Sequence, residues 1–215
     1  MSDYTVFTVF GRGLSDEPGG DESLVDVIDA IAADGITTRG IYDVSVLRAD
    51  ADVMFWLHGK DPAALQAAVR RIRRTEELEG TDIVWSAMGV HRDAEFNKAH
   101  VPGFLRGEHA RNWLTVYPFN RSYEWYLLEA DDRRRMLADH GRRGAKFKGV
   151  VANTVSAFAL GDFEWLLPME ADELDELVDM MRDLRESEAR LHVREEVPFY
   201  TGRRIEADQI EEVLA

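Results

Sequence analysis

The sequence contains no cysteine, so disulfide bonds, thiolate metal sites, a cysteine nucleophile and cofactor attachment through a Cys-x-x-Cys-His motif are excluded. Any metal ion would need histidine, tyrosine or carboxylate ligands. Long apolar runs are also missing: no stretch approaches the roughly 20 apolar residues of a membrane-spanning helix. Residues 1–7 (MSDYTVF) lack the basic and apolar regions of a secretory signal. We therefore expect a cytoplasmic protein without a membrane partner.

Basic residues are scarce relative to acidic ones. The chain has 26 lysines and arginines against 41 aspartates and glutamates, which gives a formal net charge of -15. Such a charge repels the phosphate backbone, so a nucleic-acid partner is disfavoured. The acidity is compatible with salt adaptation or with a soluble protein whose basic residues gather in one pocket, and charge alone leaves both open.

The first half of the chain has the pattern of a ferredoxin-like unit, with the order β-α-β-β-α-β. β-branched and aromatic runs predict strands, and apolar residues at helical spacing predict helices. Gly35 follows the first helix as a C-cap, and Asp61 and Pro62 begin the second. The expected elements are strand 4–10, helix 23–34, strands 38–47 and 53–57, helix 61–73 and strand 83–90.

The second half repeats this order with different residues. The expected elements are extended segments 113–118 and 124–128, helix 131–144, paired strands 150–160 and 163–168, helix 171–188 and an extended segment 193–200. We therefore predict an α+β fold in which two tandem ferredoxin-like repeats form a β-barrel flanked by helices. The predicted division is an N-terminal repeat over residues 1–92, a connecting loop over 93–112 and a C-terminal repeat over 113–215.

Two features of the second half indicate chemistry. His140 lies near the end of the predicted helix 131–144, where its imidazole is either a metal ligand projecting into a cavity or a partner of the helix C-terminus. Residues 117–126 (YPFNRSYEWY) gather three tyrosines, a tryptophan and an arginine, either as a buried aromatic strand or as oxidisable side chains near a metal. Ordinary hydrogen-bonding roles are expected for His58, His91, His109 and His192.

Four segments in a fixed order carry a resemblance to a known family: YPFNRSYEWY at 117–126, ADHGRRGAKFKG at 138–149, LGDFEW at 160–165 and PFYTGRR at 198–204. They resemble the chlorite dismutase family of heme proteins, and most of all its coproheme decarboxylases. The resemblance implies that His140 is the proximal iron ligand. It also implies that Tyr117 is oxidised to a radical that takes a hydrogen atom from a porphyrin propionate. Hydrogen peroxide would be the oxidant, and two such rounds would convert coproheme (iron coproporphyrin III), which is both substrate and redox cofactor, into heme b.

The same resemblance implies roles for further residues. His100, on the loop before Tyr117, occupies the place of a distal base that helps to deprotonate hydrogen peroxide. Trp125 matches a tryptophan close to the substrate that shares the oxidising equivalent with Tyr117. The candidates for holding the propionates are Arg121, Tyr200, Thr201 and Arg203.

The chain also departs from the chlorite dismutases. Asn153, which we expect at the cofactor, stands where they carry a distal arginine, thirteen residues after the proximal histidine. The glutamate that supports their proximal histidine corresponds to Ala189 or, with a slip of one residue, to Glu188. The missing arginine disfavours chlorite decomposition as the activity.

Three other interpretations remain open: a heme peroxidase or chlorite dismutase-like enzyme, a heme sensor or carrier without catalysis, and a ferredoxin-like module for oligomerisation. A sensor would not require Tyr117, and an oligomerisation module would bind no porphyrin. For the leading interpretation, the family implies a homopentamer and a transient contact with the coproporphyrin ferrochelatase that supplies coproheme.

Overall fold

The computed structural model describes residues 2–13, 20–93 and 101–215. The chain forms two compact units. The N-terminal unit contains residues 1–91 together with residues 200–215, and the C-terminal unit contains residues 92–199. The end of the chain, which we expected in the second repeat, therefore packs with the first: its strand pairs with a strand of the N-terminal unit.

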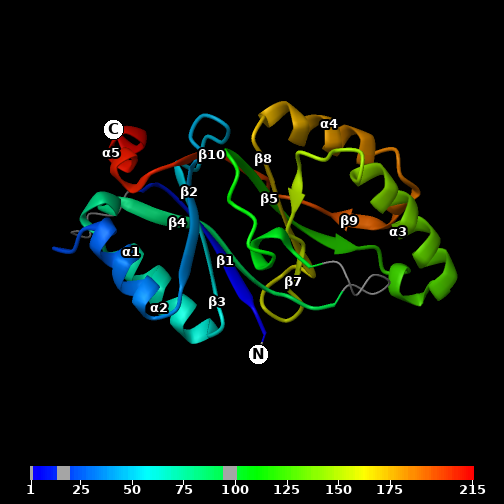
Figure 1. Ribbon diagram of the computed structural model, residues 1–215, viewed down its shortest axis with the longest axis horizontal. Coiled ribbons are helices and arrows are strands. Elements are labelled where there is room, and N and C mark those ends of the chain that lie inside the picture. The colour runs from blue at the N-terminus through cyan, green and yellow to red at the C-terminus, as the bar shows by residue number, and fades with distance from the viewer. Residues whose placement is uncertain (1, 14–19, 94–100) are drawn as a thin grey trace. The chain divides into compact units, whose positions relative to one another are not determined.

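The N-terminal unit is an antiparallel sheet with helices packed against one face (Figure 1). Its strands are β1 (Tyr4–Arg12), β2 (Thr37–Asp43), β3 (Val53–Gly59), β4 (Thr81–Val90) and β10 (Tyr200–Ile205). Its helices are α1 (Leu24–Ala33), α2 (Pro62–Ile72) and α5 (Ile210–Leu214), with 3₁₀ turns at Glu76–Leu78 and Ala207–Gln209. The strand order is β4-β1-β3-β2-β10, and the predicted β-α-β-β-α-β order of the first half is confirmed.

Helix boundaries in this unit follow from capping groups. Ser23 accepts a hydrogen bond from the Asp26 amide, and Asp61 accepts one from the Ala63 amide. After α1 the chain turns at Gly35, whose φ of 82° is readily adopted only by a residue without a Cβ. The core between sheet and helices includes Val6, Phe10, Phe55, Leu24 and Leu65.

The C-terminal unit is built around β5 (Trp113–Arg121), which pairs antiparallel with β8 on one side and β9 on the other. Its remaining strands are β6 (Val151–Ala152), β7 (Val155–Ser156), β8 (Trp165–Ala171) and β9 (Val193–Glu195). Its helices are α3 (Ala130–Gly144) and α4 (Leu174–Leu184), with 3₁₀ turns at Gly103–Leu105, Trp125–Leu127 and Glu188–His192. Helix α4 packs on β8, and α3 packs on α4 (Figure 1).

Four details of the second half differ from the prediction. The predicted extended segment 124–128 is instead the 3₁₀ turn Trp125–Leu127, because the chain turns after β5 and the Trp125 amide donates to the Ser122 carbonyl. The predicted strand 150–160 is reduced to β6 and β7, on either side of the buried Asn153. Helix 171–188 shortens to Leu174–Leu184 because Ala171 belongs to β8. Segment 193–200 divides into β9 and the start of β10.

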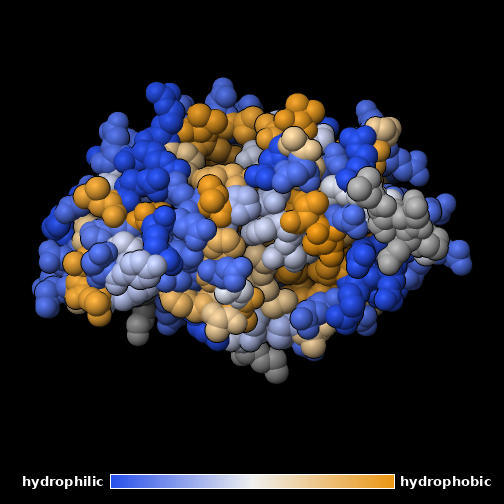
Figure 2. Space-filling view, turned by 180° about the vertical axis from the view of Figure 1, so that it is seen from behind, coloured by the Kyte–Doolittle hydropathy of each residue, from blue (hydrophilic) through white to orange (hydrophobic). Residues whose placement is uncertain are grey.

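Hydrophilic residues cover most of the surface seen in Figure 2, with smaller hydrophobic patches between them. Within the described residues, every helix is too short or too polar to cross a lipid bilayer.

The half-buried histidine on β3, His58, leads to a prediction about pH and stability. Burial and the nearby Arg39 lower the pKa of His58 to about 4. In the unfolded chain the imidazole titrates near its ordinary pKa of about 6.5. Between these values the unfolded state binds a proton that the folded state does not, so the free energy of unfolding falls as the pH falls through this window. Between pH 7 and pH 4 the free energy of unfolding should therefore fall by about 2 kcal/mol less in His58→Gln than in wild type.

Urea unfolding at several pH values between 4 and 7 measures the effect. The exposed His109, changed to Gln, is the control. The same pH dependence in wild type and His58→Gln would contradict this account.

Candidate functional site

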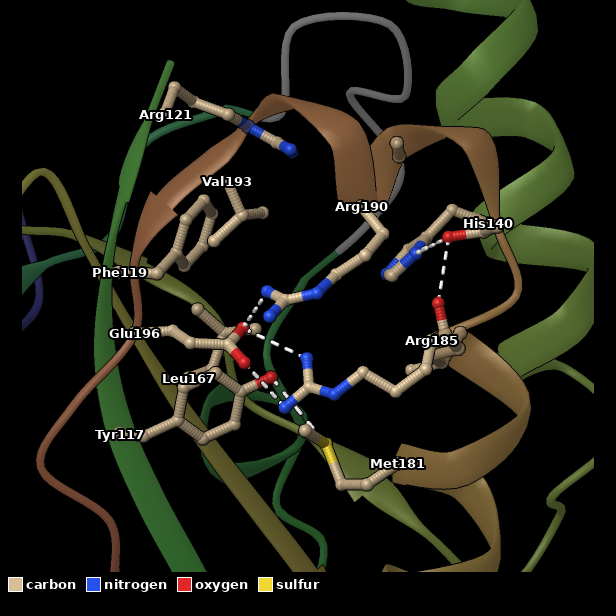
Figure 3. A pocket seen from close by; sticks show the side chains of 13 residues that line it. Tyr117, Phe119, Arg121, His140, Leu167, Met181, Arg185, Arg190, Val193 and Glu196 are labelled. Atoms are coloured by element: carbon tan, nitrogen blue, oxygen red, sulfur yellow. Dashed lines mark hydrogen bonds and ion pairs between the residues drawn. The ribbon is translucent and has the colours of Figure 1, made fainter.

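A pocket in the C-terminal unit brings together His140, Tyr117 and three arginines (Figure 3). Its walls come from β5, β8, α3, the end of α4 and the following segment up to Glu196. The empty space is about 450 Å³, including the part open to solvent.

His140 projects from the last turn of α3 into this pocket. Its Nδ1 lies 3.3 Å from Ser187 Oγ, and Ser187 Oγ donates its proton to the Leu184 carbonyl at 2.9 Å. Because the Ser187 hydroxyl already donates its proton to Leu184, it can only accept a hydrogen bond from His140. The imidazole proton is therefore on Nδ1, and Nε2 is unprotonated with its lone pair free. Burial and Arg121 lower the pKa of His140, against a smaller opposite effect of Asp139. A neutral imidazole with its Nδ1–H held in this way is suited to binding a metal ion.

The hydrogen-bond partner of His140 is neither of the two residues considered from the sequence. The Glu188 carboxylate lies 2.5 Å from Arg135 on the exposed side of α3, and Ala189 is a buried wall residue of the pocket. A serine hydroxyl accepts a weaker hydrogen bond than a carboxylate. Ser187 therefore orients the imidazole with little increase in its basicity.

Tyr117 is the buried phenol of the pocket. Its side chain, on β5, is 5% exposed, and its ring stacks on Phe199 with 4.3 Å between centroids. Its hydroxyl donates to the Met181 sulfur at 3.6 Å. Burial, and then the nearby carboxylate of Glu196, raise the pKa of Tyr117 well above the ordinary value for tyrosine. The phenol therefore keeps its proton across the physiological range.

Arg121 ends β5 at the edge of the same pocket. Its guanidinium lies 4.2 Å from the ring centroid of Trp125 and 4.9 Å from that of Phe119. Such stacking holds the cation in place while leaving its N–H donors directed sideways. Trp125 itself is 2% exposed and lies behind Arg121, packed with Met136 and Ala189.

A cluster of charged residues that no sequence motif marks lies beside Tyr117. The Glu196 carboxylate is 2.5 Å from Nη2 of Arg185, and its other oxygen is 2.8 Å from Nη1 of Arg190 (Figure 3). The only signal in the sequence was the charge-rich composition of residues 182–196, which is typical of many solvated surfaces.

Other predicted residues have different surroundings. Asn153 is fully buried: its Oδ1 accepts from the Phe104 amide, and its Nδ2 donates to the Val151 carbonyl and to Glu170. These contacts give it a structural role, and it does not line the pocket. Tyr200, Thr201 and Arg203 lie on β10 of the N-terminal unit. The ring of Tyr200 packs against that of Trp85 at an angle of 32°, and Arg203 lies 3.8 Å from Asp43. His100 lies outside the described residues.

The donors present suit an iron porphyrin better than a bare metal ion. Across residues 2–13, 20–93 and 101–215, no three histidine or acidic side chains come together as a ligand set. An iron porphyrin brings four nitrogen ligands of its own and would take one further ligand from the protein, which the His140 imidazole could provide. The arginines of the pocket can bind carboxylates at its periphery.

Comparison with known proteins gives the family. The family model described as chlorite dismutase matches residues 21–205. The chain belongs to this family. A relative named coproheme decarboxylase, from Mycolicibacterium smegmatis, is 51% identical over 215 aligned positions, which cover 96% of this chain and 92% of the relative.

Solved structures of the family have the same fold. A cyanide complex of a variant chlorite dismutase from Candidatus Nitrospira defluvii has a TM-score of 0.81 and 18% identity, covering 99% of this chain and 95% of that one. The imidazole complex of chlorite dismutase from the same organism has a TM-score of 0.79 and 20% identity, covering 98% and 94%. The predicted α+β fold of chlorite dismutase type is therefore confirmed.

The contacts of Asn153 predict that its loss affects stability. Asn153→Ala leaves the Phe104 amide and one Glu170 oxygen without this partner inside the fold, so we expect the free energy of unfolding to fall by about 2–3 kcal/mol. Denaturant unfolding measures the loss. Asn112→Ala, which removes an exposed amide of the same unit, should cost less than about 0.5 kcal/mol. Equal stability of the two variants would show that the buried contacts contribute little.

Proposed function

We propose that this chain is a coproheme decarboxylase, which uses hydrogen peroxide to convert two propionates of iron coproporphyrin III into vinyl groups and so produces heme b. The observation that carries the proposal is that one pocket contains a neutral imidazole with its Nε2 lone pair unprotonated, a buried tyrosine and several arginines. The 51% identity to a protein named coproheme decarboxylase supports the same assignment.

The proposed reaction consists of two identical rounds, and in each round one propionate is oxidised by one hydrogen peroxide. Each propionate loses carbon dioxide, one proton and two electrons and becomes a vinyl group. One hydrogen peroxide takes up these two electrons, this proton and a second proton from solvent, and becomes two water molecules. Bound coproheme supplies the redox chemistry that brings peroxide and propionate together. His140 would hold the iron from the proximal side through Nε2, while Ser187 holds Nδ1.

Tyr117 would be the group that takes a hydrogen atom from the propionate. Because its pKa is raised, the phenol holds its proton until it is oxidised, and it then loses an electron and a proton together. Its burial and its stacking on Phe199 shield the oxidised phenol from solvent and fix its orientation. The resulting radical would take the hydrogen atom from the β-carbon of the propionate and return to the phenol. The propionate would then give up its second electron, which also goes to the reduction of peroxide, as its carboxylate leaves as carbon dioxide.

The remaining assignments extend this proposal. Arg121 would bind a propionate, and Trp125, stacked behind it, would share the oxidising equivalent with Tyr117. His100 would act as the distal base toward peroxide. Tyr200, Thr201 and Arg203, expected from the sequence to contact propionates, lie on β10 of the N-terminal unit and are not part of this proposal. We further propose a cytoplasmic homopentamer that receives coproheme from coproporphyrin ferrochelatase by transient contact.

The replacement of Tyr117 by phenylalanine tests the function. Purified protein is loaded with iron coproporphyrin III, hydrogen peroxide is titrated, and porphyrin masses are followed. Wild type should lose the two carboxyl groups in turn and end at heme b. Tyr117→Phe should bind coproheme within about twofold of wild type, because only a hydroxyl is lost, but should form product at least about 100-fold more slowly.

Tyr123→Phe is the matched control, since that side chain is 76% exposed and does not line the pocket. Product formation by Tyr117→Phe at the wild-type rate would exclude the role of this tyrosine. If coproheme keeps its mass while the protein oxidises peroxidase dyes or consumes chlorite, the decarboxylase assignment is wrong. His100→Ala, run beside it, should slow the peroxide-dependent step.

Ser187→Ala tests the orientation of the proximal imidazole. Without the hydroxyl acceptor, His140 loses the partner that fixes its tautomer, so the affinity for iron coproporphyrin should fall about tenfold. Absorption titration of the Soret band measures this. Ser122→Ala breaks a similar serine–histidine hydrogen bond, to His192, outside the pocket and should leave the affinity unchanged. Equal affinities of all three proteins would show that Ser187 does not position His140.

A further inference from the structure

Glu196 is the only carboxylate that lines the described part of the pocket, and both of its oxygens are bound by arginine. Arg185 approaches with Nη2 at 2.5 Å from one oxygen and Nη1 at 2.9 Å from the other, which is the bidentate geometry of a guanidinium–carboxylate pair. Arg190 adds a third contact at 2.8 Å. The Glu196 side chain is 14% exposed, whereas those of the two arginines are 39% and 38% exposed.

The position of this carboxylate is informative because it lies beside the reactive phenol. Figure 3 shows the side chains of Arg185 and Arg190 directed toward Glu196, with the Tyr117 ring next to it. The charges of all three residues act on the Tyr117 hydroxyl, with Glu196 raising its pKa and both arginines lowering it. A propionate whose β-carbon reaches Tyr117 would have its own carboxylate within this same small region.

On the basis of the proposed function, we infer that Glu196 is an internal substitute for the reactive propionate, occupying the Arg185–Arg190 site until the substrate carboxylate displaces it. Two guanidinium groups held together in a half-buried pocket repel each other, and Glu196 offsets that repulsion in the free protein. Coproheme brings a carboxylate of the same chemistry, so the exchange conserves the number of charge-assisted hydrogen bonds to the arginines.

The exchange has a consequence for the product. Decarboxylation replaces the propionate carboxylate by an uncharged vinyl group, which cannot accept hydrogen bonds from Arg185 and Arg190. Glu196 is then the carboxylate available to pair with them. The site therefore discriminates in favour of coproheme over heme b, and re-formation of the glutamate pair accompanies product release.

Replacement of Glu196 by glutamine tests the inference by equilibrium binding without peroxide. Dissociation constants are measured for iron coproporphyrin III and for heme b, with wild type and Glu196→Gln. Glutamine keeps the shape but removes the competing charge. The dissociation constant for coproheme should therefore fall about five- to tenfold, with that for heme b changing less than about twofold. Glu186→Gln, which removes the same charge from a side chain that is 76% exposed outside the pocket, is the control and should change neither constant.

A double-mutant cycle separates exchange at the arginines from a general charge effect. Arg185→Gln alone should weaken coproheme binding. When Glu196→Gln is added to Arg185→Gln, the logarithm of the dissociation constant for coproheme should fall by less than half of the amount by which Glu196→Gln lowers it in wild type. The inference is overturned if Glu196→Gln weakens coproheme binding, tightens both porphyrins equally, or has the same effect with and without Arg185. If Glu196→Gln does not fold, Glu196→Asp replaces it, because the shorter side chain cannot bring its carboxylate to both arginines. The dissociation constant for coproheme should then also fall. An unchanged constant in Glu196→Asp would overturn the inference.

Failure of this inference and failure of the proposed function give different results. If Tyr117-dependent decarboxylation is observed while Glu196→Gln leaves the coproheme constant unchanged, only the exchange is wrong. If coproheme binds with the predicted selectivity but is not decarboxylated, the carboxylate site stands and the reaction assignment fails.

Discussion

The antiparallel pairing of β5 with β8 is the constraint on which the pocket depends. Because side chains alternate between the two faces of a strand, Tyr117, Phe119 and Arg121 all project to the face that α4 covers. Tyr117 lies opposite Leu167 in this register, and Leu167 also lines the pocket. A slip of one residue would turn the phenol and the guanidinium to the other face. The buried residues on both faces of β5 make such a slip costly.

A second constraint holds the two helices at the distance that the imidazole requires. Helix α3 contributes His140, and the turn after α4 contributes Ser187, whose hydroxyl is itself fixed by the Leu184 carbonyl. The Arg143 side chain, one turn further along α3, reaches Asp183 at the end of α4. The orientation of the imidazole is therefore set by the packing of α3 against α4 and does not depend on a single hydrogen bond.

Local patterns and recognisable segments account for what could be predicted from the sequence. The capped helices α1 and α2 and the apolar runs of β1, β3 and β5 carry strong local signals, and their positions were predicted closely. His140 and Tyr117 were identified through their segments, and the structure brings both to one pocket. Weaker local signals failed: residues 124–128 carry aromatic side chains typical of strands, yet a turn forms because hydrogen bonds to the Ser122 and Glu124 carbonyls compete successfully with strand pairing.

Contacts between residues far apart in the sequence could not be predicted from local sequence patterns. The partner of His140 lies 47 residues away in the sequence, and Asn153 acquires its structural role from Phe104 and Glu170, 49 and 17 residues away. The Arg185–Glu196 pair is closer in sequence, but nothing in a run of charged residues indicates which of them turn inward. These contacts are decided by how α4 and the segment after it fold back over β5.

The net charge of -15 is not spread evenly over the protein, because the pocket has the opposite sign. Three arginines and one glutamate line it, so the pocket is locally cationic in a strongly acidic chain. Because charges within the low-dielectric pocket interact more strongly than those on the surface, the local cations dominate the binding of a carboxylate, while the acidic exterior repels the same ligand elsewhere. The distribution of charge thus favours one site for an anionic porphyrin over non-specific adsorption. Within that pocket, Glu196 pairs with both Arg185 and Arg190 and so offsets part of their positive charge.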